Sequence, residues 1–389
     1  MEVVYTGEDM PTQFTKTIFL AGPTPRNQKE SESWRPDALK ILEDKGFDGV
    51  VFVPEGRDGK FKLDYDDQVG WEEKYLNVAD CIVFWVPRDL TPDSKGMPKM
   101  AALTTNIEWG SWCDTGKVVF GAPPDAPKNN YLKHYSEKYK VPVGDTLTET
   151  LEHAMEMLGD GAERTEGERY VPLYIWNTDA FQSWYLAQKS AGNRLDHAQV
   201  LWTFRPGFKK FVFMWVLKVD VFVESENRNK TNEFVLARTD ISSVLLWHKK
   251  RPLEESEVVL IKEFRSPAST ADGFIRELPG GSSSKKEDAI EVAAGEVHEE
   301  TGFHLDPERL HAQGSCQLAG TLSSHKCYLY SAELDEEEIK WFKSQDGIVH
   351  GNVEDTERTF IEVHTVKDLI ENKVTDWSTL GMILSVINL

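Results

Sequence analysis

Residues 281–303 read GSSSKKEDAIEVAAGEVHEETGF, and this stretch decides how the second half of the chain is interpreted. It follows the turn-like sequence ELPGG (277–281) and predicts a helix over most of its length. Glu296, Glu299 and Glu300 stand three and four residues apart, so a helix places these carboxylates on one face. The second half of the stretch contains no lysine to offset their repulsion. A hard divalent cation such as Mg²⁺ or Mn²⁺ would relieve it, and an ordinary acidic helix is the alternative.

The same stretch resembles the Nudix box, G-x5-E-x7-R-E-U-x-E-E-x-G-U, in which U is a bulky apolar residue. The matching positions are Gly281, Glu287, Glu296, Val297, Glu299, Glu300, Gly302 and Phe303. Gly295 departs from the pattern, because the family carries an arginine there. The resemblance implies an α/β/α sandwich in which Glu296, Glu299 and Glu300 hold Mg²⁺ (or Mn²⁺). It also implies hydrolysis of a nucleoside diphosphate linked to another group, with Glu296 as a catalytic residue and the identity of the base left open.

Strand-like sequences surround the box. EVVLIKEFR (257–265) precedes ELPGG, and this order resembles the ADP-ribose pyrophosphatase branch of the Nudix family. That branch implies that Arg265 contacts the diphosphate, that Glu277 faces the site, and that ADP-ribose is the lead substrate. After the box, the acidic sequence at 350–366 resembles the loop that closes over the diphosphate in this branch. Its candidate acids are Glu354 and Glu357, and a solvated acidic turn is the alternative.

In the first part of the chain, short apolar runs alternate with helical patterns. The apolar runs are TIFLA (17–21), GVVFVP (49–54), CIVFWVP (81–87) and KVVFGAP (117–123). This alternation predicts a Rossmann-like parallel sheet with helices on both faces. Ligands of such sheets lie beyond the carboxyl ends of the strands. The rule brings together the loop after Ala21, the segment around Glu72 and the loop that leads to Glu108.

The sequences FLAGPTPR, GWEEKYLNVAD, CIVFWVPRD and TTNIEWG resemble a nucleoside 2-deoxyribosyltransferase-type domain. The resemblance implies that Glu108 attacks the anomeric carbon of the sugar and that Glu72 contacts the leaving base and donates a proton to it. Arg26 and Arg88 follow two of the strands and are candidates for a substrate phosphate, and Asn106 is a further substrate-binding candidate. Water in place of an acceptor base would make the domain an N-glycosidase. The alternative is a Rossmann-like domain in which Glu108 is only a helix-start acid.

Length, charge and cysteine usage limit the remaining choices. The chain has 389 residues and a formal net charge of −21, which disfavours nucleic acid as a partner. Its four cysteines form no CxxC pair, and neither a signal-peptide run nor a membrane-spanning stretch is found, so we expect a cytoplasmic protein without membrane contact. We predict a transferase-like domain at 1–160, a linker or packing segment at 161–205 and a Nudix domain at 206–389. Both resembled families favour a homo-oligomer.

These observations predict a bifunctional enzyme of nucleotide metabolism that acts on small nucleotides or nucleosides. The first domain would transfer or hydrolyse an N-glycosidic bond, and the second would hydrolyse a diphosphate. One hypothesis links them: the first domain would release ADP-ribose from NAD⁺, and the second would cleave it. Two alternatives stay open. The Gly295 replacement is typical of a degenerate domain that senses a nucleotide without cleaving it. A housecleaning hydrolase of modified nucleotides would carry the same motifs.

Overall fold

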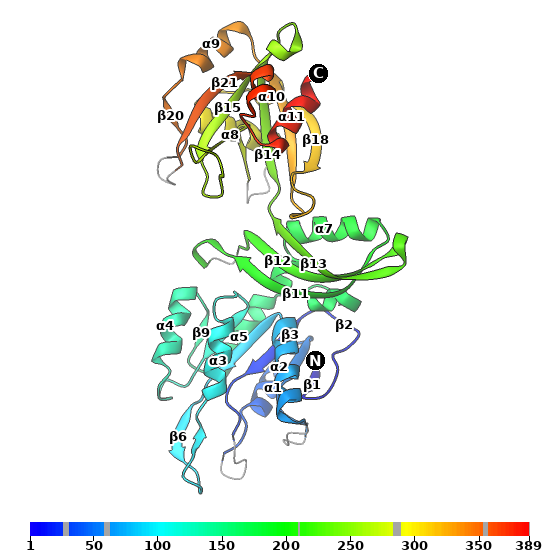
Figure 1. Cartoon of the computed structure of the whole chain (residues 1–389). Helices are drawn as coiled ribbons and strands as arrows, with labels where there is room; N and C mark the ends of the chain where they lie inside the picture. The colour runs from blue at the N-terminus through cyan, green and yellow to red at the C-terminus, as the bar shows by residue number, and fades with distance from the viewer. Residues whose placement is uncertain (26–30, 58–62, 209–210, 283–288, 353–356, 389) are drawn as a thin grey trace. The chain divides into compact units, whose positions relative to one another are not determined.

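The computed structural model describes residues 1–25, 31–57, 63–208, 211–282, 289–352 and 357–388 (Figure 1). The chain divides into two compact units, Met1–Leu236 and Ala237–Leu389. Of the residues named above, Arg26, Glu287 and Glu354 lie outside the described ranges. Within those ranges, no helix is both long enough and apolar enough to cross a membrane.

A parallel sheet of six strands forms the centre of the first unit, in the order β1-β4-β3-β5-β8-β9. The strands are β1 (Glu2–Tyr5), β3 (Thr17–Ala21), β4 (Val50–Val53), β5 (Cys81–Trp85), β8 (Val118–Gly121) and β9 (Val143–Gly144). Every residue of β3, β4, β5 and β8 is buried, which explains their unbroken apolar sequences. The predicted parallel sheet of a Rossmann-like domain is therefore confirmed.

Helices cover both faces of this sheet (Figure 1). They are α1 (Arg35–Asp44), α2 (Tyr65–Val78), α3 (Leu103–Trp112), α4 (Asn130–Tyr139) and α5 (Leu147–Leu158). Successive side chains of a strand point to opposite faces, so Phe19 packs with α2, α3 and α4, whereas Leu20 packs with α1 and α5. α2 and α3 thus share one face of the sheet, and both begin at the edge where the parallel strands end.

The polar segment before Tyr170 differs from the loose linker that its composition predicts. Arg164 is fully buried in β10 (Arg164–Thr165), which pairs with β2 (Gln13–Phe14). Its guanidinium forms a buried ion pair with Asp80, 2.6 Å from Oδ2. Arg164 thus ties this part of the predicted linker or packing segment (161–205) to the part of the first unit that contains Asp80.

The remainder of the first unit continues past this turn. It consists of two helices, α6 (Leu173–Trp176) and α7 (Asp179–Ser190), and a three-stranded sheet of β11 (Arg194–Phe204), β12 (Met214–Val223) and β13 (Arg228–Arg238). Earlier in the chain, β6 (Asp89–Pro92) and β7 (Pro98–Met100) form a separate hairpin. These elements belong to the first unit, except that the last two residues of β13, Ala237 and Arg238, fall in the second. The domain boundaries predicted after residues 160 and 205 stay predictions.

The second unit contains a mixed sheet in the order β18-β19-β14-β15-β21-β20, with β16 beside β15 and β17 beside β14. Its strands are β14 (Ile241–His248), β15 (Glu257–Phe264), β16 (Phe274–Glu277), β17 (Gly280–Gly281), β18 (His311–Gln317), β19 (Lys326–Glu333), β20 (Val349–His350) and β21 (Thr359–Thr365). β14 and β19 run parallel, and the other paired strands are antiparallel.

Two pairs of helices enclose this sheet: α8 (Ala289–Thr301), α9 (Glu336–Ser344), α10 (Val366–Asn372) and α11 (Trp377–Ile387). α8 and α9 share one core with Val244 and Leu246, while α10 and α11 share another with Leu245. The alternation along β14 therefore separates two apolar layers. α8 carries the acidic stretch quoted at the outset, and its assignment to a family stays a prediction.

Candidate functional site

A cavity of about 450 Å³ lies at the carboxyl ends of β3 and β4 in the first unit. The residues that follow these strands form part of its wall, and α2 and α3 supply the acids Glu72 and Glu108. The structure thus brings together the two carboxylates that the sequence placed at one sheet edge. Both carboxylates lie beyond the carboxyl ends of the strands, where ligands of this fold class bind.

The position of the Glu108 side chain depends on how α3 is packed against the sheet. The next residue, Trp109, is buried between Phe84 and Phe120, with ring centroids 5.2 Å from each. This anchor fixes the rotation of the helix and leaves Glu108 in the cavity. The pKa of Glu108 is raised to about 7, mainly by burial and also by the charge of Glu72, against the opposing effect of Arg35. At neutral pH both protonation states of this carboxyl are therefore populated.

Glu72 receives a hydrogen bond from its own helix. The side-chain amide of Gln68, one turn earlier on α2, donates from Nε2 to Glu72 Oε1 at 2.6 Å. Burial raises the pKa of Glu72, whereas this hydrogen bond and the charge of Arg35 lower it. Two carboxyl groups in one cavity can divide the roles of nucleophile and proton donor between them.

Arg35 is a functional residue that sequence reasoning missed. It is 1% exposed and donates to the carbonyl oxygens of Leu20 and Gly22 and to the hydroxyl of Thr24, and it forms an ion pair with Glu55. These bonds hold the loop after β3 against the cavity, and the guanidinium supplies the positive charge beside the two acids. The signal was an arginine at the start of an otherwise amphipathic helix, which also has an ordinary surface interpretation.

Glycine is required at the start of this loop. A Cβ on Gly22 would lie 2.2 Å from the carbonyl oxygen of Trp85, and the residue has a φ of +148°. The close approach lets β3 and β5 end side by side at the cavity. The Gly-Pro turn in the sequence therefore marks a packing constraint as well as a strand end.

Arg88 and Asn106 do not line the cavity that contains Glu108. Arg88 is buried and donates to Asn106 Oδ1 at 2.7 Å and to the carbonyl oxygen of Ala101 at 2.8 Å. These bonds fix the turn that leads into α3. In this structure the two predicted substrate-binding residues position the helix of Glu108, since the donors of Arg88 are used within the protein. The predicted phosphate contact of Arg26 concerns a residue outside the described ranges.

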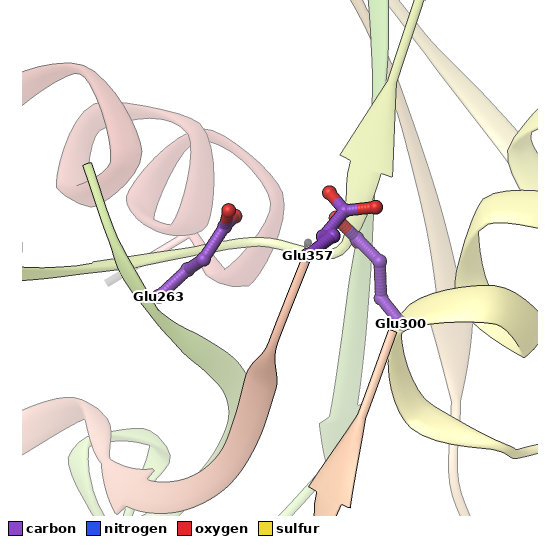
Figure 2. Close-up of side chains that lie close together, drawn as sticks. All are labelled: Glu263, Glu300 and Glu357. Atoms are coloured by element: carbon purple, nitrogen blue, oxygen red, sulfur yellow. The ribbon is translucent and has the colours of Figure 1, made fainter. Parts of the chain in front are cut away.

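The second unit gathers acids from three segments (Figure 2). Glu263 is the penultimate residue of β15, Glu300 lies in α8, and Glu357 precedes β21. One oxygen of each lies within 4.8 Å of the others. Among the described residues, this is the group that could hold a metal ion. It includes only Glu300 of the predicted trio Glu296, Glu299 and Glu300. The difference arises because β15 and the segment before β21 lie beside α8, a long-range contact that the helical spacing could not reveal.

Burial disfavours the charged forms of two members of this group, Glu263 and Glu300, and of the neighbouring Glu296. Glu300 is 2% exposed and accepts a hydrogen bond from the Gly280 amide at 2.8 Å. Burial raises the pKa of Glu300 well above its ordinary value, against this hydrogen bond, and the charge of Glu296 adds to the increase. Burial likewise raises the pKa values of Glu263 and Glu296 to about 7. A bound divalent cation would offset these effects, so the donor set fits Mg²⁺ or Mn²⁺.

The glycines of ELPGG allow this arrangement. A Cβ on Gly281 would lie 2.4 Å from Glu296 Oε1, and a Cβ on Gly280 would lie 2.1 Å from the carbonyl oxygen of Ser242. Any larger residue would displace the carboxylate or the strand. Gly295, in contrast, is exposed and has no atom within 4 Å of an added Cβ. Among the residues that the structure describes, no contact explains why this helical position is glycine.

Arg265 and Glu277, two of the predicted substrate-binding residues, lie in contact with each other. The guanidinium is 3.1 Å from Glu277 Oε1 and 2.7 Å from Glu263 Oε2. Arg265 therefore contacts the acidic group directly and leaves part of its side chain, 41% exposed, open to solvent. Glu357 belongs to the group, Glu299 is exposed on α8, and Glu354 lies outside the described ranges.

Comparison with known proteins addresses the first unit. Residues 15–126 match the family described as "Nucleoside 2-deoxyribosyltransferase like". This match includes Glu72 and Glu108, so the first unit contains a nucleoside 2-deoxyribosyltransferase-like domain, which suggests glycosyl transfer with nucleoside substrates. No curated protein matches the chain.

Proposed function

We propose that the first unit breaks the N-glycosidic bond of a nucleoside or nucleotide. The observation that carries the proposal is the placement of Glu72 and Glu108 in one cavity, within the part of the chain that resembles a glycosyl transferase family. Burial of the two acids favours their reaction with the substrate, because fewer water molecules solvate the carboxylates inside the cavity.

In the proposed reaction, the ionised Glu108 attacks the anomeric carbon while the bond to the base breaks. Glu72, in its protonated form, gives its proton to an acceptor atom of the departing base. The sugar is then an ester of Glu108. A second base or a water molecule attacks the same carbon, releases the carboxylate and restores the proton to Glu72. Transfer and hydrolysis differ only in this second nucleophile.

An activity screen tests this proposal. The purified chain is incubated with deoxynucleosides and with NAD⁺, and chromatography follows the release of free base. Glu108→Ala should reduce release by at least about 10³-fold, as for other enzymes that lose a nucleophile. Glu73→Ala removes an exposed acid next to Glu72 and serves as the matched control with unchanged release. Equal rates in the wild type and Glu108→Ala would reject the proposal.

A second function is favoured by the acidic group around Glu300. We infer that the second unit hydrolyses a nucleoside diphosphate linked to another group, with ADP-ribose as the lead substrate. Glu263, Glu300 and Glu357 would hold Mg²⁺ or Mn²⁺, which when bound neutralises diphosphate charge and lowers the pKa of a water molecule. Arg265 would bind a phosphate oxygen, and its ion pair with Glu277 would orient it.

Metal removal and one variant test this second function. AMP release from ADP-ribose should require Mg²⁺ or Mn²⁺ and stop on chelation. Glu300→Gln should abolish it, whereas Glu291→Gln, an exposed acid on the same helix, should not. Nucleotide binding without any turnover would favour the sensor alternative. Preference for modified nucleotides over ADP-ribose would favour a housecleaning hydrolase.

A further inference from the structure

The cavity of the first unit contains a polar group that the proposed reaction leaves unused, the side-chain oxygen of Gln68. Gln68 is 9% exposed and lines the cavity together with Glu72. Its Nε2 lies 2.6 Å from Glu72 Oε1, 3.4 Å from the Thr6 hydroxyl and 3.5 Å from the carbonyl oxygen of Pro54. A backbone carbonyl can only accept, so these contacts identify the nitrogen end of the amide.

The opposite end, Gln68 Oε1, is buried and has no hydrogen-bond partner among the residues that the structure describes. Leaving a buried acceptor unpaired costs about 1–3 kcal/mol, so most buried polar atoms have partners. The amide cannot turn this oxygen toward another donor without giving up the bond from Nε2 to Glu72. A ligand in the cavity that carries an N–H group would supply the missing donor.

We propose that Gln68 is a specificity residue that accepts a hydrogen bond from an N–H group of the base. The inference rests on the proposed glycosidic cleavage, which puts the base beside Glu72. Glu72 gives a proton to an acceptor of the base, and Gln68 Oε1 accepts from a neighbouring donor. This pattern selects a heterocycle with an amino or carboxamide N–H beside an acceptor atom. Adenine and cytosine share this chemistry; nicotinamide presents the same N–H group beside an acceptor atom but leaves as a neutral base without a proton from Glu72, and analogues without the N–H group lack the donor.

Equilibrium binding of free bases to the full chain tests the inference without requiring turnover. Isothermal titration compares adenine with purine, cytosine with 2-hydroxypyrimidine, and nicotinamide with 3-acetylpyridine. In at least one pair, the wild type should bind the member with the N–H group about 5-fold to 100-fold more tightly. The pair that discriminates identifies the ring. Gln68→Met keeps the length of the side chain without the acceptor and should bring the ratio close to one.

The ratio of affinities is the readout, because Gln68→Met also withdraws the donor from Glu72 and lowers turnover on every substrate. Glu73→Met, on the exposed side of the same helix, is the matched control and should keep the wild-type ratio. A wild type that discriminates in no pair, or a preference that persists in Gln68→Met, overturns the inference. If circular dichroism finds Gln68→Met unfolded, Gln68→Asn replaces it, since the shorter side chain withdraws the acceptor.

This experiment separates the inference from the proposed function. Base release from nucleosides is measured on the same preparation. Absence of release, with a base preference that depends on Gln68, would reject the glycosidic reaction and retain base recognition at this cavity. Release that depends on Glu108, with a preference that does not depend on Gln68, would retain the reaction and reject the role of Gln68.

Discussion

At Glu108, burial and the nearby Glu72 carboxylate act in the same direction. Both favour the neutral acid, and the pKa of Glu108 rises from its ordinary 4.5 to about 7. The proposed nucleophile must be ionised, so its activity and its effect on stability change over the same pH range. Arg35, fixed by the loop after β3, keeps the charged form accessible near neutral pH.

The first prediction concerns stability at this residue. Between pH 4.5 and about 7 the folded chain holds the Glu108 proton more tightly than the unfolded chain does, so the free energy of unfolding falls as pH rises. Glu108→Gln removes the titrating group, so the free energy of unfolding no longer falls with pH for this reason. The variant should be more stable than the wild type by about 2–3 kcal/mol at pH 8. Denaturant unfolding at pH 4 and pH 8 measures the difference, which should be much smaller at pH 4. An equal difference at both pH values would show that Glu108 titrates normally.

The second prediction concerns activity at the same residue. Base release requires the Glu108 carboxylate and the Glu72 proton, so the rate should rise as Glu108 ionises near pH 7 and fall again at higher pH as Glu72 loses its proton. Because Arg35 contributes the opposing positive charge, Arg35→Met should move this rise to higher pH. The pH profile of kcat/KM measures the shift, and thermal unfolding checks that the variant is folded. A profile that stays in place would remove Arg35 from the electrostatics of the site.

At the scale of elements, α8 contributes Glu300 to the buried acidic group and also contains a glycine that lowers its helix stability. Gly295 lies inside this helix, is exposed and has open space around its missing side chain. Gly302 follows the helix with a φ of +73°, a conformation that suits glycine. The same residue type therefore has opposite consequences at the two positions.

The third prediction follows from this contrast. Gly295→Ala should stabilise the chain by about 0.5–1 kcal/mol, because alanine loses less backbone entropy in a helix. Gly302→Ala should destabilise it by about 1–2 kcal/mol, because φ stays positive. Denaturant unfolding of the two variants gives both values. Destabilisation by Gly295→Ala would indicate that this glycine has a contact or a backbone conformation different from the one described.

The buried pair of Asp80 and Arg164 joins elements that are distant in sequence. Asp80 also accepts hydrogen bonds from Thr17 and from the Leu173 amide, so it connects β3 and β5 with the segment after β10. Both side chains have no exposed surface. Removal of one partner leaves the other charge buried and unpaired.

The fourth prediction uses this pair. Arg164→Met should cost about 3–5 kcal/mol of unfolding free energy. The matched control is Arg194→Met, which breaks the more exposed pair with Asp196 and should cost less than about 1 kcal/mol. Thermal or denaturant unfolding distinguishes them. Similar small losses in both variants would mean that residues 159–169 are the loose linker that their composition predicted.

The elements were more predictable than the contacts between them. β3, β4, β5 and β8 fall within their predicted apolar runs, because a strand buried on both faces has few polar residues. The sequence predicts a helix over residues 71–79, and α2 begins earlier, at Tyr65, because Asp64 caps it and Gly70 is tolerated. α4 was missed, since its NYLKHYSEKY sequence has a narrow apolar face. Helix spacing and strand order were sufficient to predict that Glu72 and Glu108 lie together.

The partners of the site residues could not be predicted in the same way. Gln68, Arg35 and Glu263 acquire their roles through contacts between elements. Glu263 is one acid in an alternating strand, and only the pairing of β15 with β21 brings it close to Glu357. Residue type and spacing do not contain such information, because the same residue would be a surface acid in another register.

For the whole molecule, each unit contains its own acidic site and its own cores. If both proposed functions hold, the fifth prediction is that they can be removed separately. Glu108→Ala should stop base release and leave AMP production from ADP-ribose unchanged, and Glu300→Gln should do the reverse. With NAD⁺, the wild type should form nicotinamide and AMP, and Glu300→Gln should accumulate ADP-ribose. Absence of nicotinamide while ADP-ribose is hydrolysed would reject the link between the two reactions.

The central claim is that Glu108 forms a covalent bond to the sugar, and trapping this ester tests it most directly. A 2-deoxy-2-fluoro nucleoside slows breakdown of such an ester, because fluorine destabilises the oxocarbenium-like transition state. After incubation and proteolysis, mass spectrometry should locate the added sugar on the peptide that contains Glu108, with none in Glu108→Gln. Base release without an adduct, or an adduct on another residue, would contradict the account.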